Sequence, residues 1–389
     1  MVKISILGDI MCEPLMLGAA RQKGGSYDFS PVFSRVKTLL GESDYVIGNL
    51  ETPLAGEEAG YVSGLFSFNA PDAFAAAAKA AGVSFLSTAN NHCMDRGLEG
   101  LKRTVRTLEA QGFAHDGTHE ACDHDNAPVI VSVGDMKIAI VACTYGTNYA
   151  RHRRALPDIG YVDLLHADTE PVYNRAGQSS QSGVKRLLHQ MIKAEWICSV
   201  KKALGMTYNT ARKDDFLDEA SAKPFFDRLA AKLKRARESA DYVIFYPHVG
   251  GQFNVDPGAF TEDTIQKGLE FGADVIVASH PHVVQKAVNR AGVPVFYSIG
   301  NFSMSPNSVY LLHENLPEYG LIVHLYLENG ARAKVAFSIV RMIENRGELL
   351  QVWPVDQLPN PSIDEIGRIY ARVTGKPLTE PFIRREYTM

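Results

Sequence analysis

The chain has 389 residues, of which 46% are hydrophobic and 22% charged, and its formal net charge at pH 7 is -4. This length allows one large α/β domain or two smaller ones, and the composition is that of an ordinary globular protein. The slightly acidic balance excludes a chain that binds nucleic acid or anionic membranes through its overall charge. Any partner must therefore be recognised by a local site.

The N-terminus, MVKISILGDIMCEP, runs directly into a predicted strand, and it has only a short apolar run without a small-residue cleavage site. It therefore does not resemble a signal peptide. No run of about 18 apolar residues occurs, so the sequence predicts no transmembrane segment. The five cysteines lack CxxC spacing, as expected for reduced thiols. We expect a cytoplasmic protein.

Short runs of β-branched residues predict strands, and apolar residues three and four positions apart predict helices. In chain order the predicted strands are Lys3–Leu7, Tyr45–Gly48, Val83–Ser87, Pro128–Val133, Lys137–Cys143, Asp241–Tyr246, Val275–Ala278 and Val293–Ser298. The predicted helices are Ala70–Ala81, Gly97–Gln111 and Phe260–Phe271. Strands that alternate with helices indicate a layered α/β domain.

Two later regions depart from this alternation. From Tyr319 onward, strands alternate with turns, and Asn329-Gly330 is a typical hairpin turn, so we expect an antiparallel section there. Residues 151–234 contain few strand signals and the basic amphipathic stretch GVKRLLHQMIKAEWICSVKKALG. We interpret them as a helical insertion within a single domain of residues 1–389. The insertion either covers the site or is a solvated excursion without a chemical role.

Five polar clusters follow predicted strands. They are Gly8-Asp9, Asn49-Leu50-Glu51, Asn90 to Asp95, His248 in HVGGQFN, and the pair His280 and His282 in ASHPHVVQ. Ligands of open α/β sheets bind beyond the carboxyl ends of the strands, so these segments can converge on one crevice. A lone His-x-His pair could equally serve a core hydrogen bond and a loop cap. Five clusters together favour a site.

The residue types in these clusters agree chemically. Carboxylates, an amide and imidazoles form an oxygen and nitrogen donor set that suits divalent manganese, iron or zinc, with no need for a thiolate. A carboxylate placed between two such ions can bridge them, and the pair can activate water and stabilise a leaving oxygen. The clusters therefore predict a metal site, with two ions as the expected number.

At these residues the sequence resembles the bacterial capsule-synthesis family typified by the CapA protein of poly-gamma-glutamate production, within the calcineurin-like metallophosphoesterase superfamily. The similarity runs through GDIM, GNLETPL, ANNHCMDRG, TYGTN, HVGGQFN, GADVIVASHPHVVQ and YSIGNF, and residues 151–234 show no matching motif. The resemblance implies a four-layer α/β/β/α sandwich of two stacked sheets flanked by helices. It also implies metals at the C-terminal edge of the sheets.

The resemblance further implies roles for single residues. The implied metal ligands are Asp9, Glu51, Asn91, His248, His280 and His282. Asp9 and His282 would bind the first metal, Glu51 would bridge both, and the other three would bind the second. His92 is similar to the histidine that protonates the leaving group, and Asp95 is spaced to orient it.

Two departures from the wider superfamily affect this centre. Met11 stands where a coordinating histidine is usual, and a thioether is a poor ligand for hard divalent ions, so the first metal has one ligand fewer. The bridging carboxylate is Glu51 instead of the common aspartate, which changes its reach. Both departures are typical of the capsule-synthesis branch.

Further polar residues follow the same strand ends. Gln252, Asn254 and Asn301 are candidate substrate contacts, and Tyr145, Thr147 and Asn148 are placed in a similar manner. The alternative for each of them is loop capping or a hydrogen bond to a ligand residue.

The favoured hypothesis is a metal-dependent hydrolase. A metal-bound hydroxide would attack a phosphoester or a gamma-glutamyl-type amide of a small molecule or polymer, and His92 would assist departure of the leaving group. The alternative is a non-catalytic accessory protein of capsule polymer synthesis or export, which would act with the capsule-synthesis machinery and keep the metal site as a structural element. Family members with that role are often tied to the membrane, so the lack of an N-terminal anchor favours the enzyme.

Overall fold

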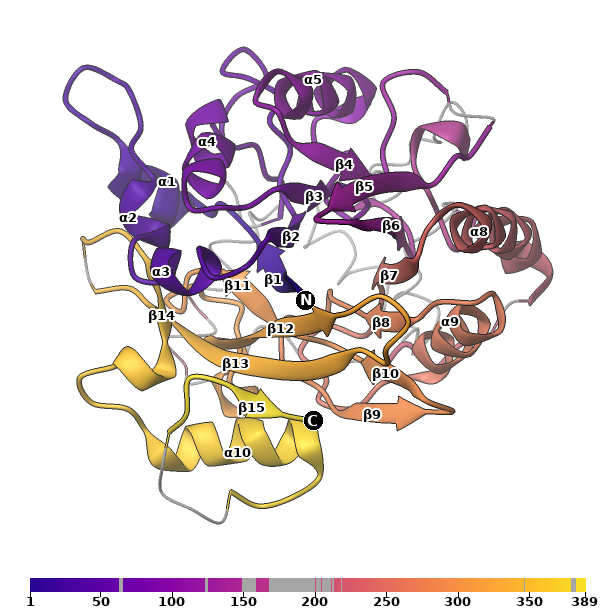
Figure 1. The fold of residues 1–389 in the computed structure, drawn as a ribbon. Coiled ribbons are helices and arrows are strands. Elements are labelled where there is room, and N and C mark those ends of the chain that lie inside the picture. The colour runs from indigo at the N-terminus through magenta and orange to yellow at the C-terminus, as the bar shows by residue number, and fades with distance from the viewer. Residues whose placement is uncertain are drawn as a thin grey trace.

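A computed structural model of the chain describes residues 1–62, 66–122, 125–148, 159–167, 200, 204, 211, 213–217, 219–345, 347–378 and 383–389. Two β-sheets stack face to face, and helices cover the outer face of each sheet (Figure 1). The expected four-layer α/β/β/α arrangement is confirmed.

Within the described residues the first sheet has nine strands, with the path β14-β13-β12-β1-β2-β3-β4. Its parallel strands are β1 (Val2–Ile10), β2 (Tyr45–Leu50), β3 (Phe85–Ser87) and β4 (Ala114–Asp116), and β11 (Asn301–Ser303) also runs parallel to β1. Its antiparallel strands are β12 (Tyr319–Leu327), β13 (Lys334–Ile343), β14 (Gln351–Pro354) and β15 (Tyr387–Thr388). The antiparallel section expected after Tyr319 is confirmed, with Asn329-Gly330 in the turn between β12 and β13.

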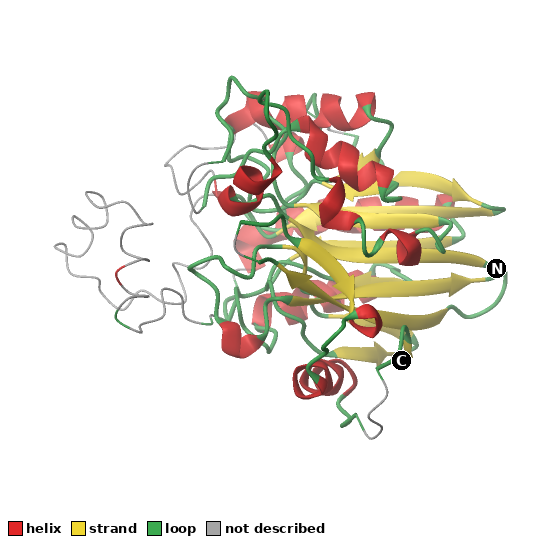
Figure 2. Cartoon of the chain, turned by 90° about the vertical axis from the view of Figure 1, so that its left-hand side faces the viewer, coloured by secondary structure: helices red, strands yellow, loops and turns green. Residues whose placement is uncertain are grey.

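In the part of the chain that the structure describes, the second sheet has six strands in the order β5-β6-β7-β8-β10-β9. They are β5 (Val129–Val133), β6 (Met136–Thr144), β7 (Tyr242–His248), β8 (Val275–Val277), β10 (Val293–Phe296) and β9 (Ala287–Arg290). Strands β6, β7, β8 and β10 are parallel. Loops gather at the end of the strands that lies away from both chain termini, which is where β1 ends (Figure 2).

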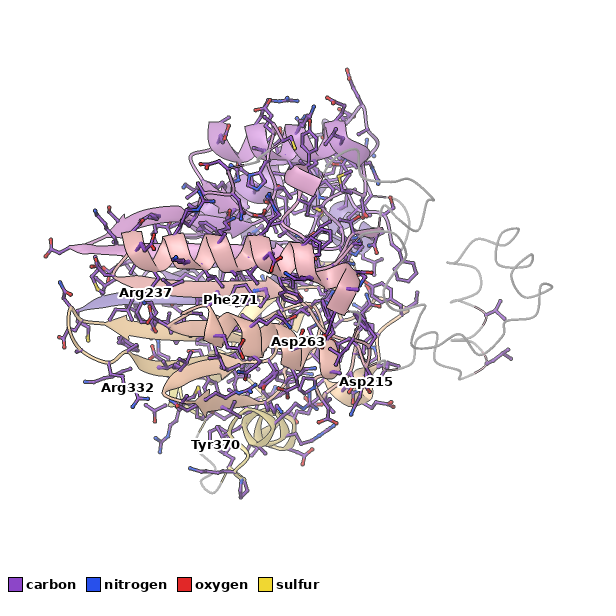
Figure 3. The ribbon with its side chains drawn as sticks, turned by 90° about the vertical axis from the view of Figure 1, so that its right-hand side faces the viewer. Asp215, Arg237, Asp263, Phe271, Arg332 and Tyr370 are labelled. Atoms are coloured by element: carbon purple, nitrogen blue, oxygen red, sulfur yellow. The ribbon has the colours of Figure 1, made fainter. Side chains whose placement is uncertain are left out.

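Helices pack on the outer faces of both sheets. The first sheet is covered by α1 (Pro14–Ala20), α2 (Ser30–Phe33), α3 (Lys37–Leu40) and α4 (Asp72–Ala80), and α5 (Gly97–Ala110) lies beside β4. The second sheet is covered by α8 (Glu219–Ser239) and α9 (Ala259–Glu270), which lie side by side (Figure 3). The last helix, α10 (Ile363–Thr374), packs its buried face against the core between the sheets. Single helical turns occur at Ile159–Tyr161, His313–Asn315 and Val355–Gln357.

An apolar core fills the space between the two sheets. Ile4 and Ile6 of β1 and Ile140 and Ile244 of β6 and β7 are completely buried in it. Strands covered on both faces carry nearly continuous hydrophobic runs, which is why these segments were readable from the sequence. The hydroxyl of Tyr246 crosses this core and donates to the carbonyl oxygen of Leu7 at 2.5 Å. This hydrogen bond links the two sheets near the ends of their parallel strands.

A buried ion cluster joins α8 to the edges of both sheets. Lys232 of α8 is 2% exposed, and its Nζ donates to Asp116 Oδ1 and Asp163 Oδ2, each at 2.7 Å. Burial alone would lower the pKa of Lys232, but the two carboxylates outweigh burial and raise it. The other oxygen of Asp116 accepts the backbone N–H of Ala142 in β6 at 2.9 Å.

The expected helical insertion, residues 151–234, lies mostly outside the described residues, as does nearly all of its basic amphipathic stretch. Its described parts include residues 159–167, which form bridges from Val162 to Thr118 and from Leu164 to Thr144, and the start of α8. The insertion and its role stay a prediction.

Candidate metal centre

The six residues expected as metal ligands lie together where the parallel strands of the two sheets end. All six residues are at most 2% exposed. Asp9, Glu51 and Asn91 come from the ends of β1, β2 and β3, whereas His248, His280 and His282 come from the ends of β7 and β8. Each sheet therefore contributes three of the six residues.

These residues form two donor groups that share one member. Ligand atoms of Asp9, Glu51 and His282 all lie within 4.8 Å of one another, and so do those of Glu51, His248 and His280. Glu51 belongs to both groups, as expected for a carboxylate that could bridge two cations.

The spacing around His248 fits a divalent cation. Its Nε2 atom lies 2.9 Å from Asn91 Oδ1, 3.0 Å from His280 Nδ1 and 3.5 Å from Glu51 Oε1. Donor atoms at about 2.1 Å from a shared cation are separated from one another by about 3.0–3.5 Å. An imidazole nitrogen, an amide oxygen and a carboxylate oxygen therefore lie around His248 Nε2 at distances that fit a coordination shell.

Glu51 provides an independent test of the fit. Both of its carboxylate oxygens are buried, and neither has a hydrogen-bond partner among the described residues. The backbone N–H of Glu51 donates to the carbonyl of Ile10 at 3.0 Å, which holds the residue beside β1. A buried carboxylate without a partner is costly, and a bound cation would supply the missing partner. The site therefore fits divalent metal.

Asp9 and His282 form the other side of the centre. Asp9 Oδ2 lies 3.3 Å from His282 Nδ1. Burial opposes ionisation of Asp9, but its hydrogen bond with His282 and the nearby His248 outweigh burial and lower its pKa. Burial would also lower the pKa of His282, but the charges of Glu51 and Asp9 raise it to about 9. A cation that binds to this imidazole must therefore displace a proton.

Strained backbone surrounds the histidine pair. Phe253, His280 and His282 have φ angles of 56°, 107° and 57°. Residues other than glycine rarely adopt this left-handed region. Such conformations cost about 1–3 kcal/mol each and cluster at functional sites. Gly250 lets the loop after β7 approach the loop after β8, because a Cβ there would lie 2.6 Å from Cγ of Pro281.

His92 lies beside the donor groups, with its imidazole buried against Phe68 at a ring distance of 4.4 Å. His92 Nδ1 is 2.7 Å from Asp95 Oδ2, as the expected pair requires. The amide nitrogen of Asn148 lies 3.2 Å and 3.4 Å from the two ring nitrogens. The backbone N–H of Asn148 also donates to the carbonyl of Asn91 at 2.6 Å. The segment after β6 therefore contacts both Asn91 and His92.

The three candidate substrate contacts lie in different environments. Asn301 is fully buried, and its Oδ1 lies 2.9 Å from His282 Nδ1. Asn254 is half-buried, and its side-chain oxygen accepts the N–H of Asp256 at 3.0 Å, as a loop cap does. Gln252 is half-buried in the same loop. A substrate role for each of them stays a prediction.

Asn49 is a site residue to which the sequence assigned no role. It faces Asp9 across the β1–β2 ladder, and its Nδ2 donates to Asp9 Oδ1 at 2.7 Å and lies 3.1 Å from His248 Nδ1. Its position in the motif GNLE, two residues before Glu51, was the available signal. Met11 lies in the apolar core under α1 and α2, in agreement with a packing residue.

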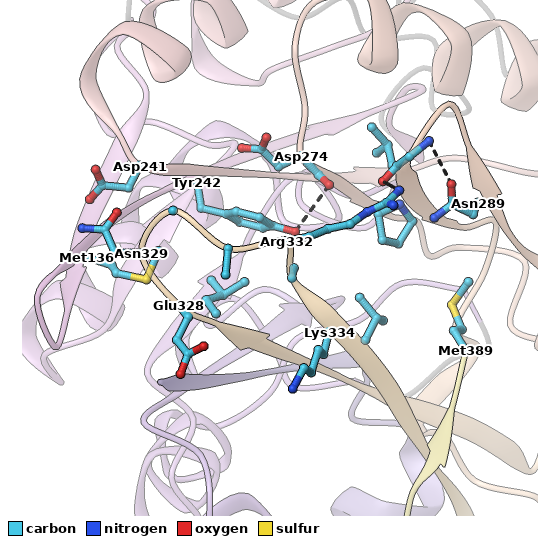
Figure 4. Close-up of a pocket in the computed structure, with 18 of the residues that line it drawn as sticks. Met136, Asp241, Tyr242, Asp274, Asn289, Glu328, Asn329, Arg332, Lys334 and Met389 are labelled. Carbon is cyan, nitrogen blue, oxygen red and sulfur yellow. Dashed lines mark hydrogen bonds between the residues drawn. The ribbon is translucent and has the colours of Figure 1, made fainter.

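A separate cavity lies away from the donor groups. It has a volume of about 810 Å³ and is lined by the β12–β13 turn and the starts of β7 and β10 (Figure 4). Arg332 in its wall donates to the carbonyl of Gly292 at 2.9 Å, and Asn289 accepts the N–H of Gly292 at 2.8 Å. Arg332 lies at the end of the molecule away from Asp215, which accepts the N–H of Ala259 at the start of α9 (Figure 3). These polar groups hold local structure, and none of them belongs to a donor group.

The sequence model of the family described as bacterial capsule synthesis protein PGA_cap matches residues 3–305. The chain belongs to this family. The match includes all six residues of the donor groups and the His92–Asp95 pair, so the capsule-synthesis resemblance is confirmed.

The alignments of this PGA_cap chain with known relatives cover only part of each protein. The uncharacterised protein y4sH of Sinorhizobium fredii is 25% identical over 286 residues, which cover 70% of this chain and 61% of that protein. The capsule biosynthesis protein CapA of Bacillus anthracis is 25% identical over 303 residues, which cover 77% of this chain and 59% of that protein. The chain therefore spans about three fifths of the length of these relatives.

The chain is also similar in structure to a solved 5'-nucleotidase candidate from Staphylococcus aureus, in complex with alpha-ketoglutarate. The alignment covers 91% of this chain and 54% of that chain, with 13% sequence identity and a TM-score of 0.44. In the described part of the PGA_cap chain, no helix is both long and apolar enough to cross a membrane.

Proposed function

We propose that this chain is a metal-dependent hydrolase of the PGA_cap family that holds two divalent cations and cleaves a phosphoester or a gamma-glutamyl-type amide. The observation that carries the proposal is Glu51, whose two buried oxygens accept no hydrogen bond from the described residues and which belongs to both donor groups. A buried carboxylate without hydrogen-bond donors is stabilised by bound cations, and its place in both donor groups supports a bridging role.

The residues divide into two sets by what they can do. Asn91, His248 and His280 would hold one cation with Glu51, and Asp9 and His282 would hold the other. The bound cations would supply Lewis acidity and lower the pKa of coordinated water. They could be manganese, iron or zinc, because the donors are oxygen and nitrogen atoms.

His92 would donate a proton to the leaving group. Its Nδ1 is committed to Asp95, at 2.7 Å, and this bond fixes the orientation of the ring. General acid catalysis needs such a fixed imidazole and contributes typically about 10²–10⁴-fold to the rate. Both an alkoxide and an amine leaving group need a proton, so this pair serves either substrate class.

The test measures metal and turnover in the same preparation. The full chain is loaded with manganese, iron or zinc, its metal content is determined, and hydrolysis of generic phosphodiester and gamma-glutamyl substrates is followed. We expect metal-dependent turnover of one substrate class. His280→Ala should lose metal and turnover together, whereas the control His313→Ala, at a 56% exposed side chain, should lose neither. A fully loaded chain that cleaves neither class would contradict the proposal.

The names of two relatives favour a second candidate. The Bacillus proteins are called capsule biosynthesis protein CapA and PGA biosynthesis protein CapA. A non-catalytic accessory protein of capsule polymer synthesis would use the metal site as a structural or polymer-binding element. Binding of the metal-loaded chain to poly-gamma-glutamate or to membrane synthase subunits, without turnover, would favour this candidate over the hydrolase.

A further inference from the structure

The two donor groups are unequal in number and kind. The group around His248 has four side chains: Glu51, His248, His280 and Asn91. The group around His282 has three among the described residues, namely Asp9, Glu51 and His282, because Met11 packs in the apolar core. The larger number of donors favours the first of these groups for any divalent cation, and its two imidazoles favour it further for zinc and iron.

The carboxylates also differ in how far they are already engaged. Asp9 Oδ1 accepts a hydrogen bond from Asn49 Nδ2 at 2.7 Å, and Asp9 Oδ2 accepts the backbone N–H of His280 at 3.3 Å. The oxygens of Glu51 accept no hydrogen bond from the described residues. A cation beside Asp9 must therefore share a carboxylate whose charge the protein already neutralises in part.

Asn301 determines which ring nitrogen of His282 faces a cation. Asn301 Nδ2 donates to the carbonyl oxygens of His282 and Pro317 at 3.0 Å and 2.9 Å, so its amide can face only one way. Its Oδ1 is thereby aimed at His282 Nδ1, which must carry the proton and donate at 2.9 Å. Nε2, which lies 3.6 Å from Glu51 Oε1, is the nitrogen left to bind metal.

We infer that the two cation positions fill in order. The position at His248 and His280 binds the first cation tightly, and the position at Asp9 and His282 binds a second, more weakly held cation. Asn301 is a positioning residue for the second position, since it fixes the tautomer and orientation of His282. Losing such a partner typically costs about 10–100-fold in metal affinity. This inference rests on the metal site of the proposed function.

The experiment titrates the metal-free full chain with Mn²⁺ by calorimetry and by electron paramagnetic resonance. We expect a first equivalent at least about tenfold tighter than the second, with the spectrum of an isolated ion at one equivalent and spin coupling at two. Asp9→Asn should keep the tight equivalent and lose the weak one. His280→Ala should lose the tight one.

Asn301→Leu should weaken the second equivalent by about 10–100-fold and leave the first unchanged. The tautomer of His282 is read separately by ¹⁵N nuclear magnetic resonance of the unsubstituted chain loaded with Zn²⁺, so an Asn301 variant that fails to fold does not remove the test. We expect a proton on Nδ1 and metal on Nε2.

The outcomes separate the inference from the proposed function. A chain that binds no cation at all overturns the proposed function. Two equivalents of equal affinity overturn the filling order alone, and so does a tight equivalent that survives His280→Ala but is lost in Asp9→Asn. Metal on Nδ1 of His282 overturns the role of Asn301.

Discussion

The Oδ2 atom of Asp95 lies 2.7 Å from His92 Nδ1 and also accepts the backbone N–H of Phe68 at 2.7 Å. The carboxylate is thus fixed from two sides and in turn fixes the imidazole. We expect Asp95→Asn to lower kcat by about 10²–10⁴-fold, because the ring loses the partner that sets its tautomer. Bound metal should stay unchanged, since Asp95 is in neither donor group.

Glu109→Gln is the matched control for this substitution. Glu109 lies 3.5 Å from His115 in a histidine–carboxylate pair on the surface, with the carboxylate 59% exposed. Steady-state kinetics and metal analysis of both variants check the prediction. Equal kcat in Asp95→Asn and the unsubstituted chain would show that His92 needs no orienting partner.

Removal of the metal should destabilise the protein, and Glu51→Gln should abolish that effect. A cation that binds only the folded chain stabilises it by about 2.7 kcal/mol at a hundredfold excess over Kd. Glu51 belongs to both donor groups, so its loss affects both positions. Thermal unfolding with added Mn²⁺ or with a chelator measures the difference. If added Mn²⁺ stabilised Glu51→Gln as much as the unsubstituted chain, the cations would have to bind elsewhere.

Lys232→Met should cost about 3–5 kcal/mol in the free energy of unfolding, because it leaves Asp116 and Asp163 buried without their cation. The same helix offers a control in Lys223→Met. The pair of Lys223 with Asp227 is 71% and 65% exposed and should contribute less than about 1 kcal/mol. Denaturant unfolding of the two variants compares a buried with an exposed ion pair. Similar losses would contradict the buried cluster.

The buried His324 should make the protein less stable in acid. Burial, together with the charge of Lys3, lowers its pKa to about 4, and the ring lies between Ser5 and Ser338. An unfolded histidine has a pKa of about 6.5, so between these values the unfolded chain binds more protons than the folded one. The contribution of His324, about 3 kcal/mol, is present above pH 6.5 and is lost as pH falls toward 4.

His324→Gln removes this titration. We expect the difference in unfolding free energy between the unsubstituted chain and the variant to shrink by about 3 kcal/mol as the pH falls from 7 to 4. Parallel curves would show that His324 titrates alike in both states. His324 belongs to neither donor group, so the substitution should leave metal binding unchanged.

The sequence predicted the strands that carry the site because their hydrophobic runs are nearly continuous. It missed β4 and β9, since AHD and AVNR contain few or no β-branched residues and form strands only by pairing with neighbours. The helix α10 was also missed, although Ser362 caps its start and Gly375 follows its end.

Within the site, residues directly after a predicted strand were identifiable, but their partners were not. The contact of Asn49 with Asp9 depends on the register between β1 and β2, which no local pattern encodes. Lys232 is one of several charged residues in α8, and only the tertiary fold places it between two carboxylates. The dual hydrogen bonding of Asn301 likewise depends on Pro317 and His282, which meet only in the folded chain.

The donor atoms of the centre are divided between the two stacked sheets, which has a mechanical consequence. Asp9 and Glu51 follow strands of the first sheet, whereas His248, His280 and His282 follow strands of the second. Each cation would bind donors from both sheets and would therefore link the two layers. A chelator should then speed amide hydrogen exchange at the ends of β1 and β7 together, while the β12–β13 hairpin keeps its protection.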